Sequence, residues 1–231
     1  MKLRPRSLKR HRHVQGDSFP LVDAMEAHLR TGIAIFNAGG YHAAHDAWED
    51  HWLELESGTA DERFLHGLIQ FTAAVHHGLN GNWAGLKGLA ESGAGYLKGL
   101  PATYRGVDVV SVRTYLQALA ADPEHIERTP IPRLRFEGAI LRLTDLEFDA
   151  IAIAADVLTE EFDAYDEALV ADAVRYAREA VGRDDQNQFV PLVMDFVTDP
   201  ENRAIAYQRL VEHVERRRDR ESDVDGLFQS E

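Results

Sequence analysis

Histidines, carboxylates and tryptophans are concentrated in one short stretch of this chain, residues 36–52. If a helix begins near Tyr41, His45 and Glu49 lie one turn apart on a single face. The two tryptophans of the stretch are also four residues apart, so they share a neighbouring face. The spacing therefore predicts a helix that has histidine and carboxylate side chains on one face and aromatic side chains on the neighbouring face.

A second helix is predicted over residues 61–78. Acidic residues lie in its first turn and a glycine lies at its end, and both positions favour a helix. His66, Gln70 and His77 follow one continuous stripe at helical spacing. Apolar residues occupy another face, so we expect this helix to pack against a core along one side and to present polar groups along the other.

The two stretches and the residues just after them contain a specific series of motif residues, namely Phe36, Asn37, Gly39, Tyr41, Ala44, His45, Asp46, Glu49 and Trp52, then Phe64, Leu65, Gly67, Leu68, Ile69 and Gln70, then His77, Gly81 and Asn82. On these residues the chain, over roughly residues 21–100, resembles family 309 of the domains of unknown function. The resemblance implies a compact all-helical bundle and no established activity. Where that family usually has glutamate after the motif histidine, and often an acidic residue two before it, this chain has Asp46 and Ala43.

Several motif residues are expected to shape the fold. Gly39 suits a positive φ in the turn before the motif helix, and Asn37 suits a local backbone hydrogen bond there. Gly67 indicates a close helix crossing. The tryptophans are expected to pack in a core or an interface rather than to form a ligand platform. The structural motif is Phe36, Asn37, Gly39, Tyr41, Trp52 and Gly67.

The chain is strongly acidic, with 39 aspartates and glutamates against 25 lysines and arginines, and its formal net charge is −14. That balance opposes general attraction to nucleic acid or to an anionic membrane. Lysine occurs only at Lys2, Lys9, Lys87 and Lys98. An excess of acid with scarce lysine is typical of a salt-adapted (halophilic), archaeal-like protein, and it favours that interpretation over an ordinary acidic mesophile protein.

The sequence also excludes several kinds of site. It contains no cysteine, so disulfides, thiolate catalysis and cysteine-based zinc sites are excluded, and any metal must be held by His, Asp or Glu. The basic first residues are followed by a polar segment, which is not the pattern of a secretory signal. No apolar stretch approaches the roughly 18 residues of a membrane span. We therefore expect a soluble, cytoplasmic protein with no membrane partner.

The fold class predicted from these patterns is all-α, a multi-helix bundle with a C-terminal helical extension. The expected divisions are a basic disordered arm (1–20), the helical bundle (21–105), a connecting segment (106–156) and the helical extension (157–231). The bundle contains the motif helix, expected over 41–56, and its short connections make neighbouring helices antiparallel.

Beyond the bundle the sequence predicts less regular structure. Asp108 can cap a short helix, and a small β-hairpin is expected over 133–142. Proline at 191 interrupts a short apolar segment. Three further helices are predicted over 146–158, 165–181 and 200–220.

The polar face of the motif helix supports two interpretations. In the first, His45, Glu49 and His77 bind a divalent metal ion, with Asp46 orienting a histidine or acting as a base and Gln70 beside them. In the second, these side chains form a buried hydrogen-bonded network that fixes helix register. The second is favoured, because no complete metal signature such as His-Glu-x-x-His is present.

Three functions follow from these interpretations. The leading hypothesis is a non-catalytic binding or interaction module whose polar site stabilises the bundle or contacts a small ligand. The alternative is a metal-dependent hydrolase that uses the same site. A further alternative is a nucleic-acid adaptor acting through the basic arm, which the net charge opposes. The sequence leaves open whether the partner is a small molecule or a protein, and whether a homo-oligomer forms.

The acid excess generates a prediction about salt. We expect the melting temperature to fall as salt is lowered from molar to dilute, because the Debye length grows from about 3 Å at 1 M to about 30 Å at 0.01 M and repulsion among the carboxylates is no longer screened. Thermal unfolding followed by circular dichroism measures this. A melting temperature that is unchanged or higher in dilute buffer would contradict the salt-adapted interpretation.

Overall fold

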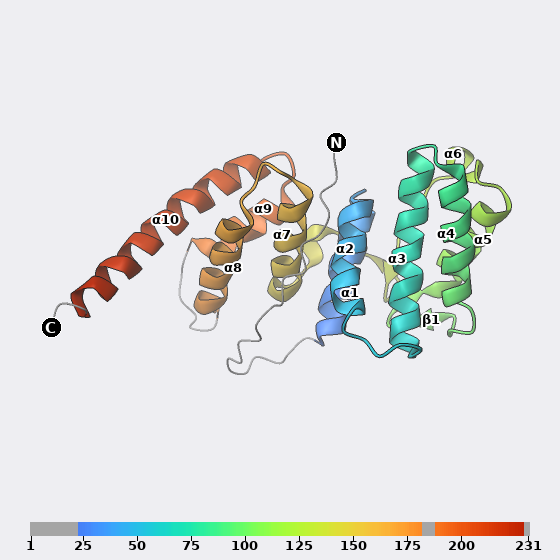
Figure 1. The fold of residues 1–231 in the computed structure, drawn as a ribbon, viewed down its shortest axis with the longest axis horizontal. Helices are drawn as coiled ribbons and strands as arrows, with labels where there is room; N and C mark the ends of the chain where they lie inside the picture. The colour runs from blue at the N-terminus through green and yellow to red at the C-terminus, as the bar shows by residue number, and fades with distance from the viewer. Residues whose placement is uncertain (1–22, 182–187, 229–231) are drawn as a thin grey trace.

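The computed structural model describes residues 23–181 and 188–228, and over these residues the protein is all-α with a small antiparallel sheet (Figure 1). The helices are α1 (Ala24–Asn37), α2 (Tyr41–Trp52), α3 (Ala60–Leu79), α4 (Trp83–Tyr96), α5 (Val109–Ala121), α6 (His125–Arg128), α7 (Phe148–Glu161), α8 (Glu167–Val181), α9 (Phe189–Thr198) and α10 (Arg203–Phe228). The strands are β1 (Thr103–Tyr104), β2 (Val107–Asp108), β3 (Arg135–Phe136) and β4 (Ala139–Ile140), and a 3-10 turn, η1, covers Leu143–Asp145. The predicted fold class is confirmed, whereas the basic arm predicted at 1–20 lies outside the described residues.

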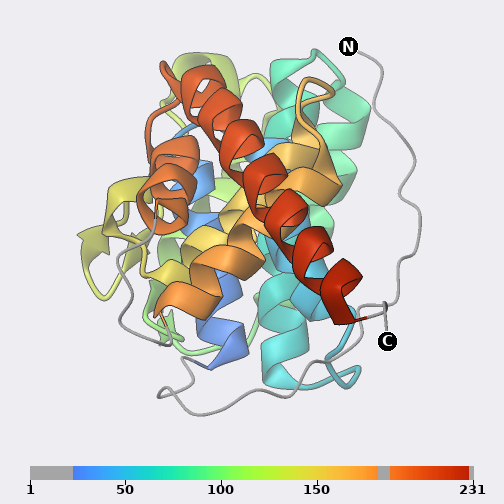
Figure 2. The same ribbon diagram turned by 90° about the vertical axis from the view of Figure 1, so that its left-hand side faces the viewer.

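The helices form a row in which each packs on its neighbours (Figure 1). Helix α3 lies between α2 and α4, and α5 packs on the far side of α4. Helix α7 packs on α1 and α2, and it also contacts α8 and α9. Helix α10 crosses over α8 and α9 at the end of the row (Figure 2). The predicted boundary at residue 157 falls within α7, and the division into bundle, connecting segment and extension stays a prediction.

The crossing of α1 and α2 depends on one tryptophan and one glycine. The indole of Trp48 is fully buried, and its Nε1 donates a hydrogen bond of 3.2 Å to the carbonyl of Leu29. A Cβ at Gly32 would lie 2.1 Å from that Nε1 atom. Only glycine therefore leaves room for the indole on α1, and the tryptophan is in the core, as the sequence predicted.

The crossing of α3 and α4 also depends on glycine. A Cβ at Gly67 would lie 2.5 Å from Leu97, and the Gly67 and Gly93 backbones approach each other closely. This confirms the close crossing predicted at Gly67. The turn before α2 also agrees with the sequence, because Gly39 has a φ of +91°.

The β-hairpin predicted over 133–142 is confirmed, and it belongs to a larger sheet. Strands β3 and β4 are joined by Glu137 and Gly138, whose φ values of 50° and 81° permit a tight turn. Strand β3 also pairs with β2 of a second hairpin, which gives the sheet order β1-β2-β3-β4. The β1–β2 hairpin, whose turn is Arg105 and Gly106, was not predicted from the sequence.

The expected local role of Asn37 is wrong. Its side-chain nitrogen donates to the carbonyls of Leu134 and Leu141, at 2.9 and 3.0 Å, and its oxygen accepts from the Leu134 amide at 2.8 Å. Asn37 therefore attaches the β3–β4 hairpin to the end of α1. The sequence predicted a local hydrogen bond in the turn for Asn37, but its side chain bonds to backbone groups about a hundred residues farther along the chain.

One predicted helix boundary and one predicted interruption are also corrected. The motif helix ends at Trp52 rather than at 56, because the chain turns there toward the cap of α3. The segment around Pro191 is a helix, α9. Proline is tolerated at this position because it lies in the first turn, where backbone N–H groups have no intrahelical partner.

The α1–α2 crossing generates a prediction about glycine substitutions. Gly32→Ala should lower the free energy of unfolding by about 1–3 kcal/mol or more, because the new methyl group overlaps the buried indole. The matched control is Gly88→Ala in α4, where a Cβ meets nothing within 4 Å. That change should stabilise the helix by about 0.5–1 kcal/mol. Urea unfolding measures both, and equal effects of the two substitutions would contradict the crossing.

Candidate functional site

Helix α2 presents a row of polar side chains along one side. His42, His45, Asp46 and Glu49 follow the spacing of a single helix face. All four are half-buried, while the alanines and Trp48 on the remaining surface of α2 are fully buried against neighbouring helices. The small alanines allow α2 to pack between α1, α3 and α7. The polar side chains are thereby held in the narrow space at the edge of that packing.

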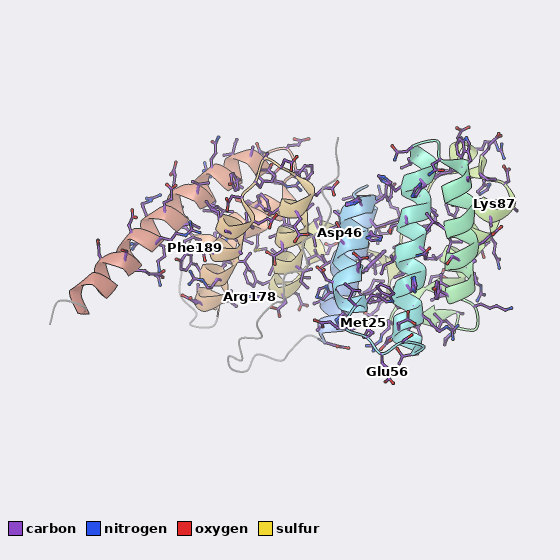
Figure 3. The ribbon with its side chains drawn as sticks, in the orientation of Figure 1. Met25, Asp46, Glu56, Lys87, Arg178 and Phe189 are labelled. Carbon is purple, nitrogen blue, oxygen red and sulfur yellow. The ribbon has the colours of Figure 1, made fainter. Side chains whose placement is uncertain are left out.

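Asp46 is the centre of this row. Its Oδ1 lies 3.2 Å from Nδ1 of His45, and its Oδ2 lies 3.3 Å from Nδ1 of His42. The same Nδ1 of His42 lies 2.8 Å from Oε2 of Glu161, the last residue of α7. Figure 3 shows Asp46 on the side of α2 that faces α7. The Asp46 side chain is only 13% exposed and that of Glu161 18%, so both carboxylates are largely removed from water.

These side chains form two groups whose ligand atoms could hold a cation. One is His42, Asp46 and Glu161, and the other is His45, Asp46 and Glu49. Within each group the ligand atoms lie within 4.8 Å of one another. Imidazole nitrogen and carboxylate oxygen are donors for first-row divalent ions. Asp46 belongs to both groups, so the two overlap in one cluster, called here the Asp46 cluster.

His76 of α3 borders the Asp46 cluster. Its ring centroid lies 6.1 Å from that of His42. Burial lowers the pKa of His76, and the neighbouring His42 and His77 lower it further, against a smaller opposite effect of Glu161. This environment therefore favours the neutral form of the His76 imidazole. From the sequence, His42 and His76 were interpreted as surface or capping residues, although the spacing of 42, 45, 46 and 49 could have identified His42 as a member of the site.

Two residues of the predicted site lie elsewhere. Nδ1 of His77 lies 2.7 Å from the side-chain nitrogen, Nδ2, of Asn82, the residue that caps α4. The Cβ of Gln70 lies 3.1 Å from the position that a Cβ on Gly93 of α4 would take. His77 and Gln70 therefore face α4. The structure brings together His45, Asp46 and Glu49, but it does not bring His77 into either ligand group.

A second polar centre lies at the other end of α2. Glu62 of α3 accepts hydrogen bonds from Nε1 of Trp52 at 3.0 Å and from the Gly58 amide at 3.2 Å, and Nδ1 of His66 lies 3.3 Å away. The backbone amide of Glu62 is capped by Thr59. Burial raises the pKa of Glu62, but these hydrogen bonds to the carboxylate outweigh it, and the pKa is lowered. Trp52 of the motif is thus tied to the start of α3.

An open cavity of about 650 Å³ adjoins Glu62. The ring of His66 stacks on that of Tyr96, with centroids 3.7 Å apart, and contacts the ring of Trp52 in a tilted arrangement at 4.6 Å. These three aromatic rings and Arg63 line the cavity. Nη2 of Arg63 donates to the carbonyls of Tyr96 and Lys98, which reduces what this nitrogen can offer a ligand.

A comparison with known protein families supports the resemblance that the motif residues of α2 and α3 indicated. Residues 29–89 match the family model Domain of unknown function (DUF309). The matching segment includes most of α1, all of α2 and α3, and half of α4, so it contains every member of the Asp46 cluster except Glu161. No curated protein matches the chain. Among the described helices, none is long and apolar enough to cross a membrane.

Glu62 generates a prediction about acid stability. Because its folded pKa lies below the ordinary value of 4.5, its contribution is present above pH 4.5 and is lost as the pH falls through the folded pKa. Glu62→Gln should lower the free energy of unfolding by about 1–3 kcal/mol at pH 7. The difference from the wild type should shrink below pH 4.5.

Urea unfolding at pH 7 and pH 3.5 tests this expectation. The matched control is Glu91→Gln on the exposed face of α4, which should have a small effect at both pH values. If Glu62→Gln lowers the free energy of unfolding by the same amount at both pH values, the hydrogen bonds do not stabilise the charged form of the carboxylate.

Proposed function

We propose that this protein is a binding module whose ligand is a divalent cation, held on α2 by His45, Asp46 and Glu49. The observation that carries the proposal is the position of Asp46, whose Oδ1 lies 3.2 Å from His45 Nδ1 in a group with ligand atoms within 4.8 Å. All three side chains come from one helix whose buried face is fixed by packing. The donors are thus pre-positioned for an ion.

The donor set indicates which ions to expect. One imidazole and two carboxylates without a thiolate favour zinc, manganese or a similar first-row divalent ion. Three protein donors leave further coordination positions to water or to a ligand. His45 remains 27% exposed, which supports access from solvent.

A metal-dependent hydrolase is the second candidate, and the same access favours it. An ion with an open position can bind water and lower its pKa, which generates a nucleophile at neutral pH. Hydrolysis that requires both the ion and Glu49 would establish this candidate over simple binding. The nucleic-acid adaptor hypothesis concerns residues 1–20, outside the described ranges, and it stays a prediction.

The proposal predicts a change in thermal stability with zinc. At a free Zn²⁺ concentration about 100 times the dissociation constant, binding to the folded state adds about 2.7 kcal/mol, or about 5–10 °C in melting temperature for a chain of this size. Glu49→Gln and His45→Ala should each abolish most of this rise. The measurement is differential scanning calorimetry of protein purified without a polyhistidine tag and stripped with a chelator.

The control is Asp50→Asn, which removes one negative charge from the exposed position next to Glu49. It should keep the zinc-dependent rise. If zinc does not raise the melting temperature of the wild type while His45→Ala still destabilises the protein, the hydrogen-bonded network is the correct interpretation and the metal proposal fails.

A further inference from the structure

Asp46 uses its two oxygens toward two different histidines. Oδ1 lies beside His45 on one side, and Oδ2 lies beside His42 on the other. We infer that a second divalent ion binds next to the first, held by His42, Asp46 and Glu161. Asp46 then bridges the two ions with one oxygen on each. This inference rests on the proposed function, because it adds an ion to the same cluster.

The separations between donor atoms agree with ligands that share an ion. Two atoms each about 2.1 Å from one ion lie about 3.0 Å apart at octahedral angles and about 3.4 Å apart at tetrahedral angles. Nδ1 of His42 lies 2.8 Å from Glu161 and 3.3 Å from Asp46, and Nδ1 of His45 lies 3.2 Å from Asp46. Small side-chain adjustments would therefore admit an ion at each position.

The charge of the cluster also favours two ions. Asp46, Glu49 and Glu161 bring three negative charges into a half-buried space. The ion pairs described for Asp46 and Glu161 are to histidines, which are neutral when they bind metal. Two divalent cations would offset the three carboxylates, and carboxylate-bridged pairs typically hold their ions about 3.5–4 Å apart.

The second ion would also have a structural consequence. Glu161 is the last residue of α7, and His42 lies in the first turn of α2. An ion between them joins the family-like segment to a helix outside the matching residues 29–89. The first position uses α2 alone, so the two ions differ in whether they link helices.

Counting ions tests the inference. Zinc is titrated calorimetrically into chelator-stripped, tag-free full-length chain, and bound zinc is counted by elemental analysis after gel filtration. All proteins carry His11→Ala and His13→Ala, because these histidines of the basic arm could bind zinc independently. Glu161→Gln removes a donor of the second position only. Glu160→Gln is the matched control, since Glu160 is the exposed neighbour of Glu161 on α7.

The expected stoichiometry is two ions per chain for the wild type and Glu160→Gln, and one for Glu161→Gln. Asp46→Asn should weaken both binding steps, and two manganese ions bridged by Asp46 should give an exchange-coupled electron paramagnetic resonance spectrum. One ion in the wild type, or two in Glu161→Gln, overturns the bridged pair and leaves the proposed function standing. No bound ion in the wild type overturns both.

Discussion

The contact of the Trp48 indole with Gly32 is the constraint on which the rest of this structure depends. It holds α2 against α1 at a distance that only glycine permits, and the Nε1 hydrogen bond to Leu29 fixes the rotation of α2. Once α2 is oriented in this way, its alanines pack inward and its histidines and carboxylates come to the edge beside α7. The position of the candidate site is therefore a consequence of core packing.

Much of this arrangement was predictable from local sequence. Helical spacing assigned His45 and Glu49 to one face of the motif helix, and the glycines at 39 and 67 indicated a turn and a close crossing. These features are predictable because each depends on residues within a few turns of one another. The hairpin around Glu137 and Gly138 was predictable for the same reason.

Several of the features that the sequence did not predict depend on partners far along the chain. Asn37 bonds to a segment about a hundred residues away, and Glu161 reaches His42 across 119 positions. Helical spacing placed His77 on the same stripe as Gln70, but both side chains lie against α4 rather than beside His45 and Glu49 of α2. Periodicity identifies a face of a helix, whereas tertiary packing decides which neighbour that face meets.

The third carboxylate of the Asp46 cluster, that of Glu161, comes from a different helix than the other two. The position two residues before His45, where the resembling family often has an acidic residue, is Ala43, and this side chain is 2% exposed in the core. An unpaired carboxylate there would be strongly destabilising, because a buried charge needs a partner. Glu161 instead brings its carboxylate from the end of α7 to His42, where an imidazole lies 2.8 Å away. The packing of α7 on α2 thus adds to the cluster a carboxylate that α2 does not carry at position 43.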